Sequence, residues 1–499
     1  MKNIFKKTTC LSAILGATLL LHSCQLDETI YSSIYTGEFY KTAADSEKGL
    51  IAAYGALSSL GGGPALTLIA DFSDDQTYPR GVVGRNTLTQ FTYDVNYTTQ
   101  KSNSRVNESP QQIWSACYSG IEKANWVIAK VPEATMDETR KKQIIGEAYF
   151  LRAFYHWFLA KNFGEIPVKI TPSYTEEEAL TAKSPKAEVY KQIYADLDMA
   201  LAAGLPSYPS VDKGRPAKEV VSALYAKAAL YNEDWAKALE KAKEVISSGK
   251  YSLMPDVLDV YKNDKEDAAR IENLWAFEVD PISPGTGHQL TGLCGPPGSA
   301  APAYARTSFG SMFAYQAFFN SFDAKDKRRQ LLDTNYIDKS GKVVAQKSIT
   351  PITTQGVLIK KYQDPSSTIG LIPNIPILRL PDVYLIAAEA EARINGGSAT
   401  AYSYINAVRK RAGVKEITGA KMKDIMHERR VELAGENERH QDLMRWDKAG
   451  LIDISAHYKI ARGPYKPSRN FVKPKHYYFP LPQREVDLSN GILIQNSNY

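Results

Sequence analysis

The stretch PAKEVVSALYAKAALYNEDWAKALEKAKEVISSG, residues 216–249, decides the fold class of this chain. Apolar residues recur in it at spacings of three and four on either side of a polar turn, first Val221, Leu224, Ala228 and Tyr231, then Trp235, Leu239, Ala242 and Ile246. That spacing is typical of one face of an α-helix. Pro216 suits a helix start, and Gly249 suits a helix end. The stretch therefore predicts two antiparallel helices joined by a short turn at residues 232–234.

Helical periodicity also dominates the sequence on both sides of this pair. After Pro185, a further set of apolar residues falls on one face of a helix: Tyr190, Ile193, Tyr194, Leu197 and Leu201. Near the C-terminus we expect a helix over residues 382–394, ended by Gly396, and a second from Ala401 to Ala412, ended by Gly413. Repeated pairs of this kind resemble tetratricopeptide (TPR) repeats in an irregular form. The expected fold is mainly α, a TPR-like scaffold of helical pairs at about residues 111–250 and 379–449.

Two long stretches lack this periodicity, at about residues 61–110 and 251–376. The first is rich in Gly, Asp, Thr, Asn and Tyr, and the second contains many Pro and Gly. Loops of such length inside a compact protein are usually functional or disordered, and the many aromatic residues here favour order. We expect one domain over residues 24–499, with binding groups in these two loop-rich regions.

The N-terminus predicts secretion and a lipid anchor. Three lysines without an acid in residues 1–7 precede an uncharged, mostly apolar run over residues 8–21, the order of a signal peptide. The run is shorter than the roughly 18 residues that indicate a spanning helix. Residues 21–24 (LHSC) resemble a bacterial lipobox, so we expect cleavage after residue 23 and acylation of Cys24. Asp27 and Glu28 resemble a surface-export signal; the alternative is an ordinary signal peptide with a chance cysteine.

The charges and cysteines of the chain limit the binding partners and the disulfides that we expect. The 61 basic and 55 acidic residues are well mixed, and no basic tract suggests nucleic acid or an anionic membrane surface. Contact with the membrane is therefore expected through the N-terminal lipid alone. If Cys24 is acylated, Cys117 and Cys294 are the two cysteines of the mature chain that could form a disulfide. We expect two buried free thiols there, with a disulfide as the alternative.

One acid–base cluster looks like an active site: Glu428, Arg429, Glu432, Glu436, Arg439, Asp442 and Arg445. Because three- and four-residue spacings also pair such groups along a helix, we expect structural ion pairs. His427-Glu428 lacks the second histidine of a zinc-hydrolase motif, since Val431 stands there. Asp71, Asp74 and Asp75 lack the spacing of an EF-hand and are expected to be loop or ligand-contact residues. No catalytic residue, metal or cofactor is predicted.

Six blocks of sequence resemble the SusD/RagB family of outer-membrane nutrient-binding lipoproteins. They are WSACYSGIEKANWVIAKV (114–131), GEAYFLRAFYHWFLAKNFGEIP (146–167), RLPDVYLIAAEAE (379–391), YINAVRKRAG (404–413), HERRVELAGENERHQDLMRW (427–446) and the tail from FPLP (479–482) to Gln495-Asn496. Pro381 departs from the alanine usual in the third block. The blocks span nearly the whole mature chain in order, which makes the resemblance specific.

The resemblance implies a non-catalytic protein that binds an oligosaccharide and delivers it to a SusC-like TonB-dependent transporter. In the family, ligand contacts come from the loop after the early helices and from the middle insertion. The corresponding regions hold the candidate ligand-binding residues Asp74, Tyr78, Arg80, Arg85, Tyr93, Asn96, Tyr97, Tyr304, Arg306, Phe309 and Tyr315. Aromatic faces stack on apolar sugar faces, and Tyr outnumbers Phe 30 to 16. The alternative is that most of these side chains pack the loops or face the transporter.

Two other functions stay open. The RagB-like branch of the same family takes oligopeptides, and Arg80, Arg85 and Arg306 would suit peptide carboxylates. A TPR-like adaptor that binds only protein is the third interpretation. Trp114, Trp126, Trp157 and Trp235 lie on helical faces and are expected in the core. The sequence does not name the glycan or the particular transporter.

Overall fold

The architecture comes from a computed structural model of the 499-residue chain. It describes residues 39–61, 74–80, 83–95, 110–279, 290–296, 304, 308–363, 374–419 and 421–499. The expected signal peptide and the expected acylation site Cys24 lie outside these residues. Within them, no helix has both the length and the apolar character needed to cross a membrane.

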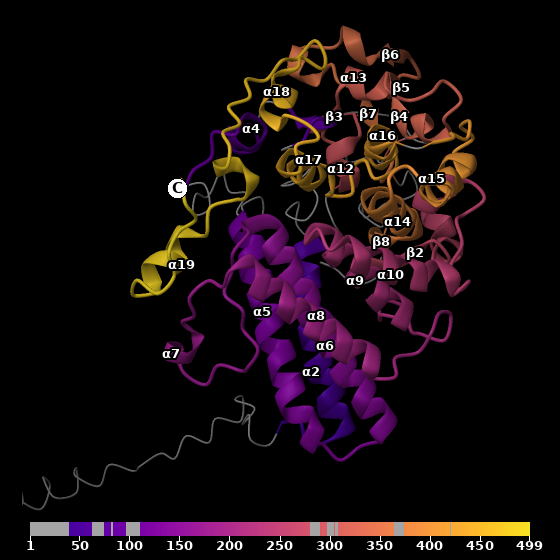
Figure 1. Ribbon diagram of the computed structural model, residues 1–499. Coiled ribbons are helices and arrows are strands. Elements are labelled where there is room, and N and C mark those ends of the chain that lie inside the picture. The colour runs from indigo at the N-terminus through magenta and orange to yellow at the C-terminus, as the bar shows by residue number, and fades with distance from the viewer. Residues whose placement is uncertain are drawn as a thin grey trace, which may run out of the picture.

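Four long helices lie side by side in the lower half of Figure 1: α2 (Ala43–Gly61), α5 (Pro110–Lys130), α6 (Glu138–Phe163) and α8 (Lys186–Ala202). Helix α6 begins after Asp137, whose carboxylate accepts the backbone N–H of Arg140 at 2.8 Å. It ends at Gly164, where φ is +81° and a side chain would be strained. The second half of α6 is buried on all sides, as expected of a central helix.

The predicted helical pairs are confirmed. Helices α9 (Lys218–Tyr231) and α10 (Trp235–Ser247) form the first pair, and Asp234 caps α10 by accepting the N–H of Lys237 at 3.1 Å. Helices α14 (Leu380–Asn395) and α15 (Ala399–Arg411) form the second. Helix α14 begins two residues earlier than expected because Pro381 occupies its first turn. Helix α10 packs against α14, and the alanine faces of α9 and α14 are buried, which lets the pairs approach closely.

The last part of the chain adds α16 (Met422–Glu432), α17 (Arg439–Lys448), α18 (Ile454–Lys459) and α19 (Gln483–Leu488). Short helices lie between the main ones: α4 (Val83–Gln90), α7 (Glu176–Ala179), α11 (Glu266–Ala269), α12 (Leu290–Cys294) and α13 (Gln316–Phe319). Single 3₁₀ turns occur at Val131–Glu133, Val257–Tyr261, Asn263–Lys265, Lys327–Leu331, Gln346–Ser348, Ile352–Thr354 and Lys475–Tyr477.

The two loop-rich regions and the residues that follow them contain short antiparallel strand pairs that the sequence did not predict. Strand β1 (Thr77–Pro79) pairs with β3 (Met312–Ala314) in the register Thr77 opposite Ala314. Strand β2 (Asn273–Phe277) pairs with β8 (Ile375–Arg379). The other two pairs are β4 (Leu332–Asp333) with β7 (Leu358–Ile359) and β5 (Asn335–Ile337) with β6 (Val343–Ala345). Each pair joins segments too short to show a period.

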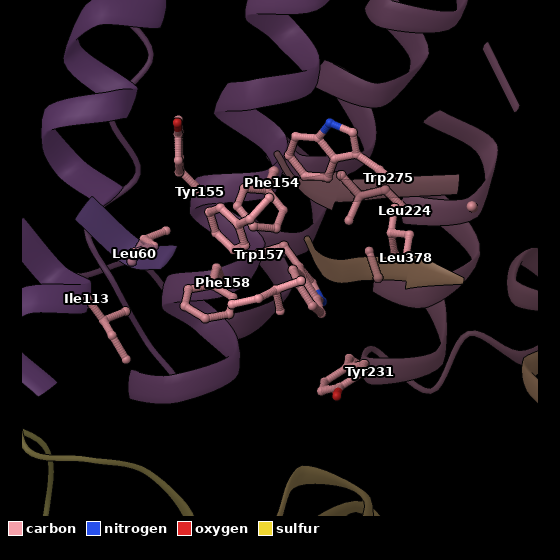
Figure 2. Packing of buried hydrophobic residues seen from close by; sticks show 14 of the residues in the cluster. Leu60, Ile113, Phe154, Tyr155, Trp157, Phe158, Leu224, Tyr231, Trp275 and Leu378 are labelled. Atoms are coloured by element: carbon pink, nitrogen blue, oxygen red, sulfur yellow. The ribbon is translucent and has the colours of Figure 1, made fainter. Parts of the chain in front are cut away.

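A large cluster of buried apolar side chains connects these parts. Figure 2 shows its centre, where Phe154 and Trp157 of α6 meet strands β2 and β8 and helix α9. The ring of Phe154 lies 5.0 Å from that of Trp275, and the ring of Trp157 lies 5.5 Å from that of Tyr231, both edge to face. The loop-rich region is therefore anchored on the helical scaffold by its aromatic residues.

Two smaller predictions have mixed outcomes. Trp114 and Trp157 are in the core as expected, whereas Trp126 and Trp235 are only half-buried. Trp235 packs against the edge of the core, with the guanidinium of Arg393 4.9 Å from its ring, and the ring of Tyr174 lies 5.0 Å from that of Trp126. Cys117 and Cys294 are buried free thiols, as expected.

Candidate functional site

The β1–β3 pair brings together the two loop regions in which the sequence placed its binding residues. Tyr78 in β1 lies opposite Phe313 in β3, and its ring lies 4.8 Å from that of Tyr315, just after β3. A third aromatic residue, Tyr465 from the C-terminal part, lies 5.0 Å from Tyr78 on another side. Three segments far apart in the sequence thus form one aromatic group.

Most of the described candidates are buried in this structure: Asp74, Tyr78, Arg85, Tyr93, Tyr304 and Tyr315. Asp74 accepts the backbone N–H groups of Gln76 at 2.8 Å and Thr77 at 2.9 Å, which shapes the turn before β1. The hydroxyl of Tyr304 donates to Asp333 at 2.8 Å. In this structure these six side chains are covered by neighbouring residues, and Tyr315 also lines a cavity.

Two candidates reach the surface. Phe309 is 50% exposed, and Arg80 is partly exposed beside it, with Nη1 donating to the Phe309 carbonyl at 3.4 Å. The backbone N–H of Arg80 also donates to the carbonyl of Ser311 at 2.9 Å, so β1 and β3 place both residues together. Asn96, Tyr97 and Arg306 lie outside the described residues. Ligand contact by any of these candidates stays a prediction.

The sequence analysis missed an open cavity of about 260 Å³ next to this aromatic group. We call it the C-terminal cavity; it is lined by Tyr315, Tyr458, Lys459, Ile460, Ala461, Arg462, Tyr465, Lys466, Pro467, Ser468 and Arg469. The stretch ARGPYKPSR, residues 461–469, carried a signal that was available: turn residues interleaved with an aromatic residue and cations. The stretch has no helical period and lies outside the two loop-rich regions that the family resemblance indicates.

The walls of the C-terminal cavity are aromatic and cationic. Tyr315 and Tyr458 are buried behind the surface, while Tyr465 is half-buried. Arg469 donates from Nη2 to the hydroxyl of Tyr315 at 2.6 Å, and its guanidinium lies 5.3 Å from the ring centre of Tyr458. Burial raises the pKa of both Tyr315 and Tyr458, so their hydroxyls stay protonated at neutral pH.

A cluster of ion pairs around Asp75 lies next to the cavity, because the cavity-lining Arg462 is 4.0 Å from its carboxylate. The carboxylate pairs with Arg439 at 2.7 Å, His457 at 2.9 Å and Arg430 at 3.4 Å. Burial raises the pKa of Asp75, but Arg439 and Arg430 lower it more, and the result is well below the usual range. Asp75 was expected to be a loop or ligand-contact residue; it lies in the loop before β1, where it is a buried anion that joins this loop to α16, α17 and the end of α18. Among the described residues, no group of three or more His, Cys, Asp or Glu side chains is placed to hold a metal ion.

The acid–base cluster of α16 and α17 is a buried network of ion pairs, as the structural interpretation predicted. Arg379 pairs with Glu272 at 2.9 Å, with Glu432 at 3.0 Å and with Glu436 at 2.6 Å, and its side chain is fully buried. Further pairs in the network include Arg328–Glu428, Arg328–Glu432, Arg429–Asp382, Arg429–Asp442, Arg445–Asp442 and Arg445–Glu389. The cavity beside this network has about 40 Å³, room for a few water molecules. These carboxylates are therefore held by arginines and are not open to a substrate.

Comparisons with known proteins give a consistent result. The family described as "SusD family" matches residues 249–499, and the one described as "Starch-binding associating with outer membrane" matches residues 68–230. SusD-like protein P2 of Formosa agariphila is 28% identical over 96% of this chain and 98% of its own length. Surface glycan-binding protein A from Bacteroides uniformis has a TM-score of 0.77 at 24% identity, covering 91% of this chain and 99% of its own. Surface glycan-binding protein A from Bacteroides thetaiotaomicron in complex with laminarihexaose has a TM-score of 0.73 at 22% identity, covering 92% and 100%. At these identities the solved structures establish the mainly α, TPR-like fold.

Proposed function

The chain belongs to the SusD/RagB family, and from that premise we propose that it binds an oligosaccharide at the cell surface and passes it, uncleaved, to a SusC-like TonB-dependent transporter. In this proposal residues 1–23 direct secretion, and acylated Cys24 anchors residues 24–499, a single SusD-like domain, to the outer membrane facing the exterior. The relatives support the ligand class, because two similar structures are named as surface glycan-binding proteins and one of them contains laminarihexaose.

The observation that carries the proposal is the aromatic group beside an open cavity. Tyr465 is half-buried, its ring lies 5.0 Å from Tyr78, and it lines the C-terminal cavity together with Tyr315. A partly exposed aromatic ring held by other rings is a rigid surface on which a sugar ring can stack. Phe309 adds a second exposed ring on the neighbouring part of the β1–β3 pair. We therefore place Tyr465 and Phe309, with Arg80, at the centre of the proposed ligand surface.

Binding without hydrolysis agrees with the charges at this surface. Glycoside hydrolysis requires two carboxyl groups on either side of the scissile bond. No acidic residue is among those that line the C-terminal cavity in the described part of the chain. The nearby Asp75 is buried and paired with arginines, and Asp74 accepts backbone N–H groups. Neither carboxylate is positioned to donate a proton to a leaving group.

Oligopeptide binding is the second candidate, and the cations near the cavity favour it. Arg80, Arg462 and Arg469 lie on or next to the proposed surface, and guanidinium groups bind carboxylates in a bidentate manner. Arg85, which the sequence suggested as a partner for peptide carboxylates, is buried, and Arg306 lies outside the described residues. A protein-only adaptor is the third candidate, which a titration with free ligands separates from the other two.

The test is a calorimetric titration of lipid-free protein, residues 25–499, which retains every described residue. Plant, microbial and host glycans and a peptide pool serve as ligands, and mass spectrometry checks each for cleavage. We expect saturable binding of an intact glycan. Tyr465→Ala should weaken it about tenfold, because the loss of one stacking ring removes roughly 1–2 kcal/mol.

Tyr174→Ala is the matched control, because Tyr174 is 63% exposed and belongs to the segment beside α7, away from the cavity. It should leave the affinity unchanged. Saturable binding of peptides alone would favour the RagB-like alternative, and no binding of any free ligand would favour the adaptor. Products of cleavage would refute the non-catalytic part of the proposal.

A further inference from the structure

The C-terminal cavity has an uneven charge. Four of the eleven residues that line it are cationic, Lys459, Arg462, Lys466 and Arg469, and none of these eleven is acidic. None of them carries a side-chain amide either, so the polar groups are cations, tyrosine hydroxyls and the hydroxyl of Ser468. A neutral sugar presents hydroxyl groups that both donate and accept, and carboxylates and amides are the usual partners for their protons. The lining therefore suits a ligand rich in hydrogen-bond acceptors better than it suits a neutral sugar.

The charge of Arg469 is not neutralised by a contacting carboxylate. Its Nη2 donates to the neutral hydroxyl of Tyr315, and its Nη1 has no hydrogen-bond partner among the described residues. Its guanidinium lies 5.7 Å from the ring centre of Tyr315 and 6.0 Å from that of Phe91. The acid that acts on it electrostatically is Asp74, which is engaged with the backbone of the β1 loop. Aromatic rings hold this cation in place without cancelling its charge.

Arg462 is held mainly by backbone carbonyls. It donates from Nη1 to Ile460 at 2.8 Å and from Nη2 to His457 at 2.6 Å, and its Nε is 4.0 Å from Asp75. The single charge of Asp75 also faces Arg430 and Arg439. Burial lowers the pKa of Arg462, Asp75 offsets part of this effect, and Arg469 lowers the pKa further. Three guanidinium groups thus share the charge of Asp75, and Arg462 is the one of the three that lines the cavity.

The rim carries two more positive charges. Lys459 and Lys466 are exposed, and neither forms an ion pair with a residue in the described part of the chain. Charges of one sign around a concave surface reinforce each other and attract counter-ions to the site.

We propose that the C-terminal cavity binds an anionic sugar unit, a carboxylated or sulfated residue of the oligosaccharide. The anion lies between Arg469, Arg462 and the rim lysines, and the sugar ring packs against Tyr465. The inference rests on the proposed glycan-binding function and gives its ligand a chemical class that the neutral laminarihexaose of the similar structure does not have. The volume of about 260 Å³ is at the lower end of ligand sites, which suits one or two sugar rings of a longer chain.

The test compares ligands that differ only in charge. Residues 25–499 are titrated at low salt with oligogalacturonate and its methyl ester, and with a sulfated galactan oligosaccharide and its desulfated form. We expect at least one charged member to bind at least about tenfold more tightly than its neutral counterpart, as one or two charge-assisted hydrogen bonds would produce. The carboxylated and sulfated arms identify which anion the site prefers. Added salt should weaken the charged ligand selectively.

Two variants locate the effect. Lys466→Gln removes an exposed rim charge without disturbing packing, and Arg469→Gln removes the charge beside Tyr315. Each should lower the affinity for the charged ligand about three- to tenfold and lower the affinity for the neutral one by less, so that the preference for the charged ligand shrinks. Lys48→Gln, which removes an exposed charge on α2 far from the cavity, should have no effect.

The outcomes separate the two proposals. If neutral and charged members of every pair bind equally well, and Lys466→Gln changes neither, the anionic site is refuted while glycan binding stands. If no glycan of either kind binds, the proposed function fails together with the inference. If the charged ligand is preferred but Lys466→Gln and Arg469→Gln leave the preference intact, the anion binds elsewhere and the assignment to this cavity is wrong.

Discussion

Arg379 shows how single residues stabilise this molecule. It lies at the end of β8 and directly before α14, and its guanidinium donates to three carboxylates, those of Glu272, Glu432 and Glu436. Arg411 shares two of these acids, at 2.8 Å from Glu272 and 2.5 Å from Glu432. Burial raises the pKa of Glu432 and the three arginines around it lower the pKa more, so the acid stays ionised. A buried network of this kind is stable only while every charge has its partner.

Replacing Arg379 should therefore be strongly destabilising. Arg379→Met keeps the approximate length of the side chain but leaves Glu272, Glu432 and Glu436 short of one cation. We expect the free energy of unfolding to fall by roughly 3–5 kcal/mol, the loss typical of breaking a buried ion pair from one side. Denaturation in urea, followed by circular dichroism, measures the change.

Lys191→Met is the matched control. Lys191 pairs with Glu188 one helical turn away on α8, but both side chains are largely exposed, and such pairs contribute little in water. Its urea midpoint should equal that of the unmodified protein. Equal midpoints for Arg379→Met and Lys191→Met would show that the network around Arg379 contributes no stability.

At the scale of elements, glycines determine how closely the long helices approach. Gly120 in α5 faces the ring of Tyr155 in α6, where an added Cβ would overlap the ring. The ring has no freedom to move, because it is buried and its hydroxyl donates to the Ala53 carbonyl of α2 at 2.7 Å. Gly55 in α2 has nothing within 4 Å of its Cβ position and is exposed.

Replacing each of the two glycines by alanine should change the free energy of unfolding in opposite directions. Gly120→Ala should lower the free energy of unfolding by about 1–3 kcal/mol through overpacking. Gly55→Ala should raise it by about 0.5–1 kcal/mol, because alanine is the better helix former and no contact is disturbed. Thermal unfolding of both variants measures the difference. A stabilising Gly120→Ala would mean that α5 and α6 do not pack as closely as described.

Whether the sequence could predict an element depends on the length of that element and on its local period. Helices such as α9 and α10 follow from a local period, because their contact faces repeat every three to four residues. The sequence analysis placed the start of α14 at residue 382, two residues too late, because a proline in the first turn, here Pro381, is part of the helix. The β1–β3 pair leaves no such signal: its strands have three residues each and lie more than 200 positions apart. Pairing of this kind depends on tertiary packing, which no local pattern records.

At the scale of the whole molecule, the proposed ligand surface is assembled from three distant parts of the chain. Three segments meet around Tyr78: the loop before α4, the segment that ends β3, and the C-terminal stretch at residues 457–469. Asp75 in the loop before α4 binds His457 and so joins that loop to the C-terminal stretch. Family resemblance located the first two regions but favoured their tyrosines, which the structure buries. The third region was missed because neither periodicity nor the resemblance pointed to it. Only its place beside Tyr78 makes Tyr465 a candidate.

This assembly allows the central claim, that the protein binds an oligosaccharide at this surface, to be tested in the intact fold. Hydrogen–deuterium exchange of residues 25–499 is measured with and without the glycan that binds most tightly in the titration. We predict slower exchange in peptides that cover residues 457–469 and 308–316, and unchanged exchange in α2 and α5. Protection confined to other parts of the chain, with residues 457–469 unaffected by saturating ligand, would contradict the account.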